Sequence, residues 1–292
     1  MEEFLNNYEY YKDIDLVNLN TYKIHSKCKY LIYPKKIKEL INLIKHLREN
    51  NIEFVILGNG SNVILVKDIY EVIIKLDRLN IILIKNNQVE AECGVNLVKL
   101  LNICAERGLS GLEFLTSIPG QVGASTKNNA GVPDNSISDF IKEVKVLDEN
   151  YNIVTLTKDK LNFGYRTSIF KENKKLIVIS TTFILELTKP EIVKDKIKEY
   201  KKVRLNKQPY DMPNAGSVFK NPINNSAGKL IENLSLRGYN IKDAMVSKKH
   251  ANFIVNKGNA TGKDILKLIE YIKEKVKNKY DIDLELEQEI ID

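Results

Sequence analysis

Several features that define other classes of protein are missing from this sequence of 292 residues. No apolar run approaches the roughly 18 residues that a membrane-spanning helix requires, so we expect no membrane insertion. The opening residues, MEEFLNNYEYYKDID, lack the basic and apolar regions of a secretory signal, and we expect a cytoplasmic protein. Internal repeats, low-complexity tracts and proline- or glycine-rich linkers are also absent.

Cysteine and histidine are too few and too scattered to indicate a metal site. The cysteines are Cys28, Cys93 and Cys104, and the histidines are His25, His46 and His250. Neither an HxxxH nor a CxxC pairing occurs among them. We therefore expect buried, reduced thiols and no metal.

Arginine is scarce in an otherwise basic chain. The formal net charge is +7, and only six of the 45 lysine and arginine residues are arginine. The lysines are spread along the chain, mostly at exposed helical spacings, and no zinc-finger, helix-turn-helix or RNA-binding signature accompanies them. We expect no nucleic-acid partner, although the excess positive charge suits a small substrate with several negative groups.

The spacing of apolar residues predicts short strands and a few amphipathic helices. Strands are expected at 28–33, 53–58, 62–66, 71–76, 81–85, 88–93, 142–148, 152–157, 176–187, 252–256 and 282–291. Helices are expected at 35–50, 96–107, 190–205, 226–235 and 261–279, with Gly108 ending the second. A glycine-rich loop region is expected at 108–135 and a proline-containing loop at 207–222. The character of the chain changes near residue 188, where we place a domain boundary.

Two glycine-containing segments have the composition of binding loops. Gly58-Asn59-Gly60-Ser61-Asn62 lies between two apolar runs, where backbone N–H groups could converge on an anion, although a plain hairpin turn is the simpler reading. Residues 117–131, SIPGQVGASTKNNAG, allow a flat aromatic group or a pyrophosphate to approach the backbone closely. An ordinary surface loop is the alternative, but this segment is unusually apolar and rich in small residues for one.

Three further segments contain residues that suggest chemistry. Arg166, in the sequence GYRTS, is an arginine in a lysine-dominated chain, which favours bidentate recognition of a carboxylate or phosphate over a structural ion pair. Ser217 follows a glycine in a loop braced by three prolines and lacks a nucleophile elbow, so a proton-donating hydroxyl fits better than a nucleophile. Alternation along the last strand places the carboxylates of Glu285, Glu287 and Glu289 on one face, where two of them would be merely solvated.

Taken together, these motifs resemble the UDP-N-acetylenolpyruvoylglucosamine reductase (MurB) family, in its shorter type without a tyrosine-loop insertion. The matching segments lie in family order from about residue 20 to 291. They are GNGSN, GLSGLEF, SIPGQVGA with NNAG, YRTS, KQPYDMPNAGSVFKNP, SKKHANFIVN and LELE. In this chain Ser117 and Ala124 stand where the family usually has glycine, and KIHS (23–26) replaces the usual KIGG. The usual arginine and glycine after the final glutamate are missing, so only the distance from Leu284 selects Glu287 over Glu289.

The resemblance implies an α+β fold in three parts. Residues 1–20 form an N-terminal segment, 21–188 an FAD-binding domain of the vanillyl-alcohol-oxidase (PCMH) type, and 189–292 a smaller α/β substrate-binding domain. It implies FAD as cofactor, with UDP-N-acetylglucosamine enolpyruvate and NADPH as small-molecule substrates, and we expect a monomer. The activity implied is reduction of the enolpyruvyl double bond to give UDP-N-acetylmuramate, a peptidoglycan precursor.

The resemblance also implies residue roles. FAD would lie along residues from both loops, namely Gly58, Asn59, Gly60, Ser61, Asn62, Pro119, Gly120, Gly123, Ala124, Asn129, Ala130 and Gly131. Arg166, Ser217 and Glu287 would be catalytic, with Ser217 as the proton donor. Tyr165, Lys207, Lys220 and Asn221 would bind the substrate.

Two alternatives remain open from the sequence. Another oxidoreductase on the same flavin fold is the first, and turnover without a UDP-sugar would favour it. A non-enzymatic module that binds anions or nucleic acid is the second, and a colourless protein with steeply salt-dependent oligonucleotide binding would favour it.

Overall fold

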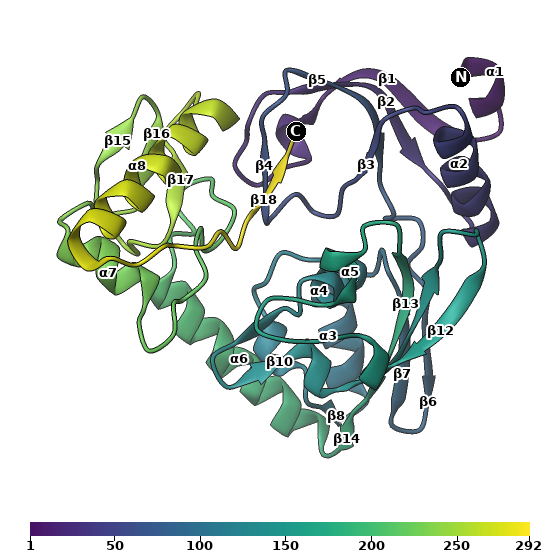
Figure 1. Ribbon diagram of the computed structural model, residues 1–292. Helices are drawn as coiled ribbons and strands as arrows, with labels where there is room; N and C mark the ends of the chain where they lie inside the picture. Colours follow the sequence, from purple (N-terminus) through teal and green to yellow (C-terminus); the bar gives the residue numbers. More distant parts are fainter. The chain divides into compact units, whose positions relative to one another are not determined.

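The computed structural model describes residues 1–292 and divides into two compact units (Figure 1). The first unit contains Met1–Tyr11, Leu31–Gly58 and Val72–Arg204. The second contains Lys12–Tyr30, Asn59–Glu71 and Leu205–Asp292. Each unit is therefore assembled from separated stretches of chain.

The fold is a mixture of helices and several small sheets, as the α+β expectation requires. The helices are α1 (Glu2–Leu5), α2 (Ile37–Glu49), α3 (Leu97–Glu106), α4 (Val122–Lys127), α5 (Ile169–Glu172), α6 (Pro190–Lys207), α7 (Ala227–Asn233) and α8 (Gly262–Tyr280). The strands up to residue 136 are β1 (Glu9–Asp15), β2 (Lys27–Tyr33), β3 (Phe54–Ile56), β4 (Val63–Leu65), β5 (Ile69–Ile74), β6 (Ile82–Lys85), β7 (Gln88–Glu92), β8 (Leu109–Ser110), β9 (Gly131–Val132) and β10 (Asn135–Ser136). The later strands are β11 (Ile141–Leu147), β12 (Ile153–Thr157), β13 (Ile177–Ile184), β14 (Glu186–Leu187), β15 (Asn240–Ile241), β16 (Ala244–Val246), β17 (Ile254–Asn256) and β18 (Glu289–Ile291). No helix among them is both long enough and apolar enough to cross a membrane.

A five-stranded antiparallel sheet of order β12-β11-β13-β7-β6 organises the first unit. Its middle strand, β13, is buried at every position but the last, which explains why the sequence reads there as a continuous apolar and small-residue run. Helix α2 buries an apolar stripe of Leu40, Leu43, Ile44 and Leu47. Helix α3 ends before Gly108, whose φ of 64° is the left-handed conformation typical of a residue that terminates a helix.

The expected loop at 108–135 is more regular than the sequence indicates. It contains helix α4 as well as the short strands β8, β9 and β10. Helix α4 forms against strand β7 because Gly123 has no side chain: a Cβ there would lie 2.7 Å from Cys93 Cβ. Glycine at this position therefore permits close backbone packing, and composition alone does not reveal that purpose.

In the second unit a three-stranded antiparallel sheet, β15-β16-β17, packs with helix α8 (Figure 1). The helix buries Ile265, Leu268, Ile269, Ile272 and Val276 at helical spacing, and a capping box of Thr261 and Asp264 begins it. Strand β18 pairs in parallel with β4, so the end of the chain lies beside residues 63–65. The expected strand at 282–291 is shorter than predicted, since only β18 and an isolated bridge at Leu286 are extended and paired.

Candidate active site

The first predicted flavin loop contributes Asn59, Gly60, Ser61 and Asn62 to the second unit. Gly60 has a φ of 61°, and a Cβ there would lie 2.2 Å from the carbonyl oxygen of Leu19. The backbone N–H of Thr21 donates to the Gly60 carbonyl at 3.0 Å. Glycine is thus required at residue 60 because the segment 19–21 lies directly against the loop.

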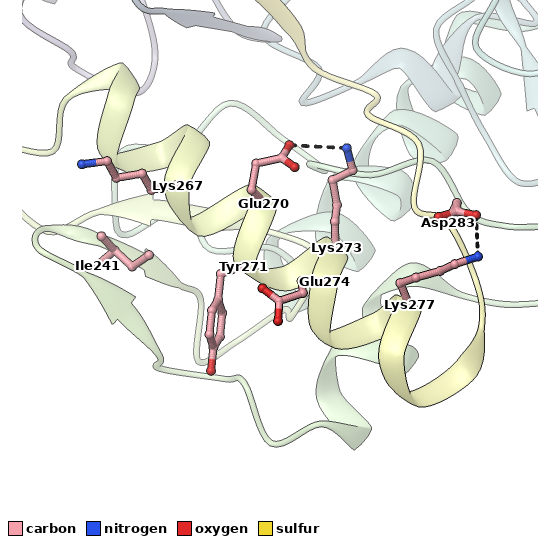
Figure 2. Close-up of a pocket in the computed structure, with 8 residues that line it drawn as sticks. All are labelled: Ile241, Lys267, Glu270, Tyr271, Lys273, Glu274, Lys277 and Asp283. Atoms are coloured by element: carbon pink, nitrogen blue, oxygen red, sulfur yellow. Dashed lines mark hydrogen bonds and ion pairs between the residues drawn. The ribbon is translucent and has the colours of Figure 1, made fainter.

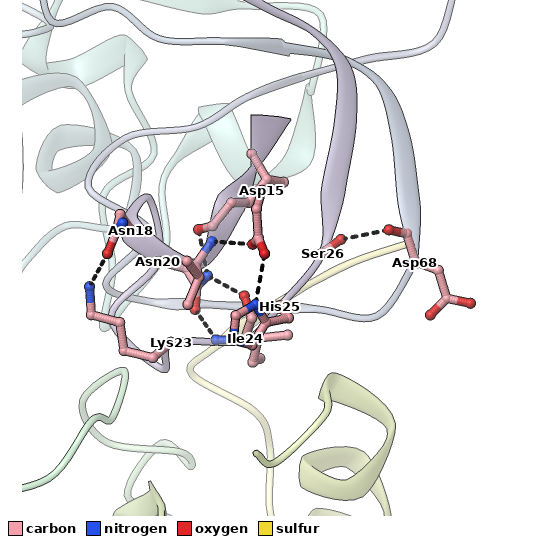
Figure 3. A network of polar contacts seen from close by, with 10 residues as sticks. Asp15, Asn18, Asn20, Lys23, Ile24, His25, Ser26 and Asp68 are labelled. Carbon is pink, nitrogen blue, oxygen red and sulfur yellow. Dashed lines mark hydrogen bonds and ion pairs between the residues drawn. The ribbon is translucent and has the colours of Figure 1, made fainter. Parts of the chain in front are cut away.

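That segment is fixed by a compact set of polar contacts (Figure 3). The buried Asn20 amide donates to the carbonyls of Leu16 and Ile24 at 2.8 and 2.9 Å, and its Oδ1 accepts from the Ile24 N–H. His25 Nδ1 lies 2.7 Å from Asp15 Oδ2 on the exposed side. The KIHS segment therefore follows a defined path to the loop at 59–62 despite its departure from the family pattern.

Ser217 and Glu287 are neighbours within the second unit. Residues 217–219 lie between two other segments, with bridges from Ser217 to Phe253 and from Phe219 to Leu286. The backbone N–H of Glu287 donates to the Val218 carbonyl at 2.9 Å, so Glu287 lies opposite the residue that follows Ser217. Both side chains are half-buried. The two segments that carry this hydroxyl and this carboxylate are distant in the sequence and lie side by side in the structure.

Asn62, the last residue of the predicted flavin loop, contacts the backbone of residues 287 and 289. Its side-chain amide donates to the Glu287 carbonyl at 3.1 Å, and its own carbonyl accepts from the Glu289 N–H at 2.9 Å. The Asn62 amide therefore holds the backbone beside Glu287. Glu289 begins strand β18 opposite Val63, one step further from Ser217.

Of the predicted substrate-binding residues in the second unit, Lys220 is the most clearly positioned. Its side chain is 16% exposed, and its ammonium lies 2.5 Å from Glu285 Oε1. Asn221 Oδ1 accepts from the Ala227 N–H at 3.1 Å. Lys207 is exposed at the end of helix α6. The Lys220–Glu285 pair holds the lysine beside the segment that carries Ser217.

The second predicted loop lies wholly in the first unit, together with Gly58. A Cβ on Gly58 would lie 3.4 Å from Ala124 Cβ, so the start of the first loop adjoins helix α4. Gly120 and Gly131 are closely packed, since added Cβ atoms would lie 3.0 Å from Ser125 Oγ and 2.3 Å from the Asn135 carbonyl oxygen. Pro119 is exposed, Ala130 is half-buried, and Ser117 has a φ of 61°. A left-handed conformation costs a non-glycine residue about 1 kcal/mol.

Arg166 is held by this second loop. Its guanidinium donates to the carbonyl of Gly131 at 2.7 Å and to that of Asn129 at 3.4 Å. It also lies over the ring of Tyr165, 5.3 Å from the centroid, and Tyr165 is 54% exposed. These contacts leave the planar group anchored by backbone carbonyls, an arrangement that an ammonium could not reproduce.

Asn129 is committed to protein contacts at both ends of its amide. It donates to the Gly164 carbonyl at 2.8 Å and accepts from the Ser138 N–H at 3.2 Å. Its side chain therefore braces the turn that carries Arg166.

Lys75 is a residue that the sequence interpretation missed. It follows strand β5, is 4% exposed, and its ammonium donates to the carbonyl of Gly58, the first residue of the flavin loop. Asp77 Oδ2 lies 3.5 Å away, and burial lowers the pKa of Lys75. The only signal in the sequence is a lysine at the end of the apolar run EVIIKL.

A hollow of about 520 Å³ elsewhere in the second unit contains none of the predicted site residues (Figure 2). It lies along helix α8, where Lys273 and Lys277 pair with Glu270 and Asp283 at 3.4 and 2.8 Å. Four of its charged residues are therefore paired with one another.

Comparisons with known proteins identify the domains of this chain and its relatives. Residues 28–157 match an FAD binding domain, and residues 208–291 match the C-terminal domain of UDP-N-acetylenolpyruvoylglucosamine reductase. A reductase of that name from Caldicellulosiruptor saccharolyticus is 42% identical over 98% of this chain and 93% of its own length. One from Clostridium tetani is 41% identical over 94% of this chain and 89% of its own. The crystal structure of the reductase (MurB) from Thermus caldophilus superposes with a TM-score of 0.81 at 30% identity, covering 98% of this chain and 99% of that one.

An FAD binding domain followed by this C-terminal domain defines an FAD-dependent oxidoreductase, with the α+β fold that the resemblance implies. The sequence identity to these reductases extends over nearly the whole chain and defines the family as well as the class. The chain belongs to the UDP-N-acetylenolpyruvoylglucosamine reductase family.

Two features of these residues are suited to binding FAD. Within their own unit, the backbone N–H groups of Asn59, Gly60 and Ser61 donate to no protein acceptor. In the first unit, the buried Oδ1 of Asn128 has no hydrogen-bond partner, at a cost of about 1–3 kcal/mol for such a group. Phosphate oxygens suit the N–H groups, and a cofactor hydroxyl or amino group suits the amide oxygen.

Proposed function

We propose that the chain reduces UDP-N-acetylglucosamine enolpyruvate to UDP-N-acetylmuramate, with bound FAD as cofactor and NADPH as electron donor. The observation that carries this proposal is the pairing of the segments of Ser217 and Glu287 beside the glycine loop at 59–62, in a chain of this family. The reaction adds a hydride and a proton across one carbon–carbon double bond. FAD, when bound, supplies the transfer of the hydride from NADPH to the β-carbon of the enolpyruvyl group.

The protein's own residues then manage charge and protons. Arg166 faces the substrate carboxylate with positive charge where negative charge develops, which is commonly the largest catalytic contribution. Ser217 Oγ donates its proton to the α-carbon, and Glu287 completes the active site. Contacts with the backbone of the second loop support the role of Arg166, since they fix its guanidinium before substrate arrives.

Binding of the nucleotide part is assigned to side chains at the edges of the site. Tyr165, Lys207, Lys220 and Asn221 bind the substrate, and the two lysines attract its phosphates. The Lys220 ammonium lies 2.5 Å from Glu285 Oε1. To bind the substrate, it must either separate from this carboxylate or contact the substrate while the ion pair is kept. Residues 21–188 supply the FAD-binding domain and 189–292 the substrate-binding domain, after an N-terminal segment of 1–20. The protein works as a cytoplasmic monomer.

Ser217→Ala tests the proposed proton donor because the two half-reactions can be measured separately. Flavin reduction by NADPH should remain near the parent rate, whereas reoxidation by the enolpyruvyl substrate should slow by roughly 10²–10⁴-fold, as positioned acids contribute. Ser217→Cys should fall between the two, because a thiol can also donate. Rapid-mixing absorbance gives both rates, and Ser235→Ala, at an exposed serine of the same unit, is the control. Reoxidation of Ser217→Ala at the parent rate would remove Ser217 from the chemistry.

A further inference from the structure

A buried hydrogen-bond chain lies directly behind Ser217 and Glu287 in the second unit. Gln288 is 4% exposed and follows Glu287 in the sequence. Its Nε2 donates to the carbonyls of Ala215 and Gly216 at 3.0 and 3.2 Å, immediately before Ser217. One side chain thus joins the backbones that carry the two proposed reactive groups.

The other end of the Gln288 amide is also occupied. Its Oε1 accepts from the hydroxyl of Tyr22 at 3.0 Å, and Tyr22 is fully buried. The Tyr22 carbonyl accepts in turn from the amide of Asn256 at 2.9 Å. Every polar atom of the Gln288 amide therefore has a partner, and no solvent competes for these bonds.

The position of Tyr22 extends this chain to the flavin loop. Thr21, its neighbour in the sequence, donates through its backbone N–H to the Gly60 carbonyl at 3.0 Å. Gly216 has a φ of 77°, which glycine adopts at no steric cost, so this residue by itself leaves the turn before Ser217 free to take other conformations. The two carbonyl bonds from Gln288 restrict that freedom.

We propose that Gln288 and Tyr22 are positioning residues that set the orientation of Ser217 and Glu287 toward the substrate. The inference rests on the proposed function, because it assigns to these two residues the alignment of the proposed proton donor. The amide of Gln288 fixes the carbonyls of residues 215 and 216, and Tyr22 fixes the amide. A residue that orients the donor should affect proton delivery and leave hydride uptake from NADPH unchanged.

Two substitutions probe this chain at different atoms. Tyr22→Phe removes one hydroxyl and leaves the ring that fills the core. Gln288→Glu keeps the acceptor for Tyr22 but replaces the donor to the two carbonyls with a second carboxylate oxygen. Protonation of the new carboxyl restores one donor, so the rate of this variant should rise as the pH falls. Gln88→Glu, at an exposed glutamine of the first unit, is the matched control.

The measurement is the rate of each half-reaction across pH, with KM and flavin content recorded for every variant. Both substitutions should slow reoxidation by the enolpyruvyl substrate roughly 10-fold, the value of about one hydrogen bond, with flavin reduction and KM close to the parent values. Gln288→Glu alone should recover at low pH. Parent-like reoxidation in both variants, with slow Ser217→Ala, would overturn the positioning role and leave the proposed function standing. Parent-like reoxidation in Ser217→Ala would instead overturn the proposed function. Where Gln288→Glu does not fold, Tyr22→Phe decides the matter.

Discussion

At the scale of single residues, the site depends on groups that are held by backbone carbonyls. Arg166 is bound to the carbonyls of Gly131 and Asn129, Gln288 to those of Ala215 and Gly216, and Lys75 to that of Gly58. A donor fixed in this way has a defined direction before any ligand binds. Preorganisation of this kind lowers the reorganisation that binding or reaction would otherwise require.

Lys75 permits a test of that idea at the flavin loop. A buried cation is costly to the fold, so Lys75→Met should leave the apoprotein about as stable as the parent. The Gly58 carbonyl would lose its donor, and we expect FAD to bind roughly 10-fold more weakly. Fluorescence titration of the apoprotein with FAD measures this, with Lys142→Met at an exposed lysine as the control. An unchanged dissociation constant would show that Lys75 serves packing alone.

The sequence predicts residue types better than it predicts partners. Arg166 and Ser217 could be selected from their unusual local settings, and glycine at residue 60 from the need for a special conformation. Tyr22 and Gln288 could not, because they are 266 positions apart and neither lies in an unusual setting. The glycines at 123 and 131 were interpreted as cofactor-binding, and the structure adds that protein contacts require glycine at both positions.

At the scale of elements, the sequence predicts long amphipathic helices from their apolar periodicity, whereas it does not predict very short strands. Helices α2 and α8 were predicted within a few residues because their apolar stripes repeat over three or more turns. The hairpin of β15 and β16 was missed because these strands have two and three residues, too few for alternation to register. Helix α4 was also missed, because it has only six residues and lies inside a glycine-rich segment.

The capping box of α8 gives a pH-dependent prediction at this scale. Burial raises the pKa of Asp264, but hydrogen bonds from Thr261 and Lys242 outweigh it and hold the pKa below the ordinary 3.8. The carboxylate therefore stabilises the fold above pH 3.8, and this contribution is lost as the pH falls through the lower folded-state pKa. Asp264→Asn should lower stability at pH 7 by about 1 kcal/mol, the usual value of such a cap.

Denaturant unfolding of both proteins from pH 7 to pH 2 measures this effect. The difference between Asp264→Asn and the parent should shrink toward zero at the acid end. Asp195→Asn is the control, since that carboxylate is 72% exposed in α6. A difference that stays constant with pH would mean that the ionised carboxylate contributes nothing to the cap.

At the scale of the whole molecule, the predicted site residues are divided between the two units. The first unit holds Arg166 and the loop at 117–131, and the second holds Ser217, Glu287 and the loop at 59–62. The assignment to the reductase family accounts for both sets in one chain, because the family combines an FAD binding domain with its own C-terminal domain.

The most direct test of this account is the absorbance of the flavin in the purified protein through one complete cycle. The protein should be yellow with non-covalent FAD, and anaerobic NADPH should bleach it. Addition of UDP-N-acetylglucosamine enolpyruvate should then restore the oxidised spectrum with formation of one UDP-N-acetylmuramate per flavin. A protein that binds no flavin after reconstitution, or a reduced flavin that this substrate leaves bleached, would contradict the account.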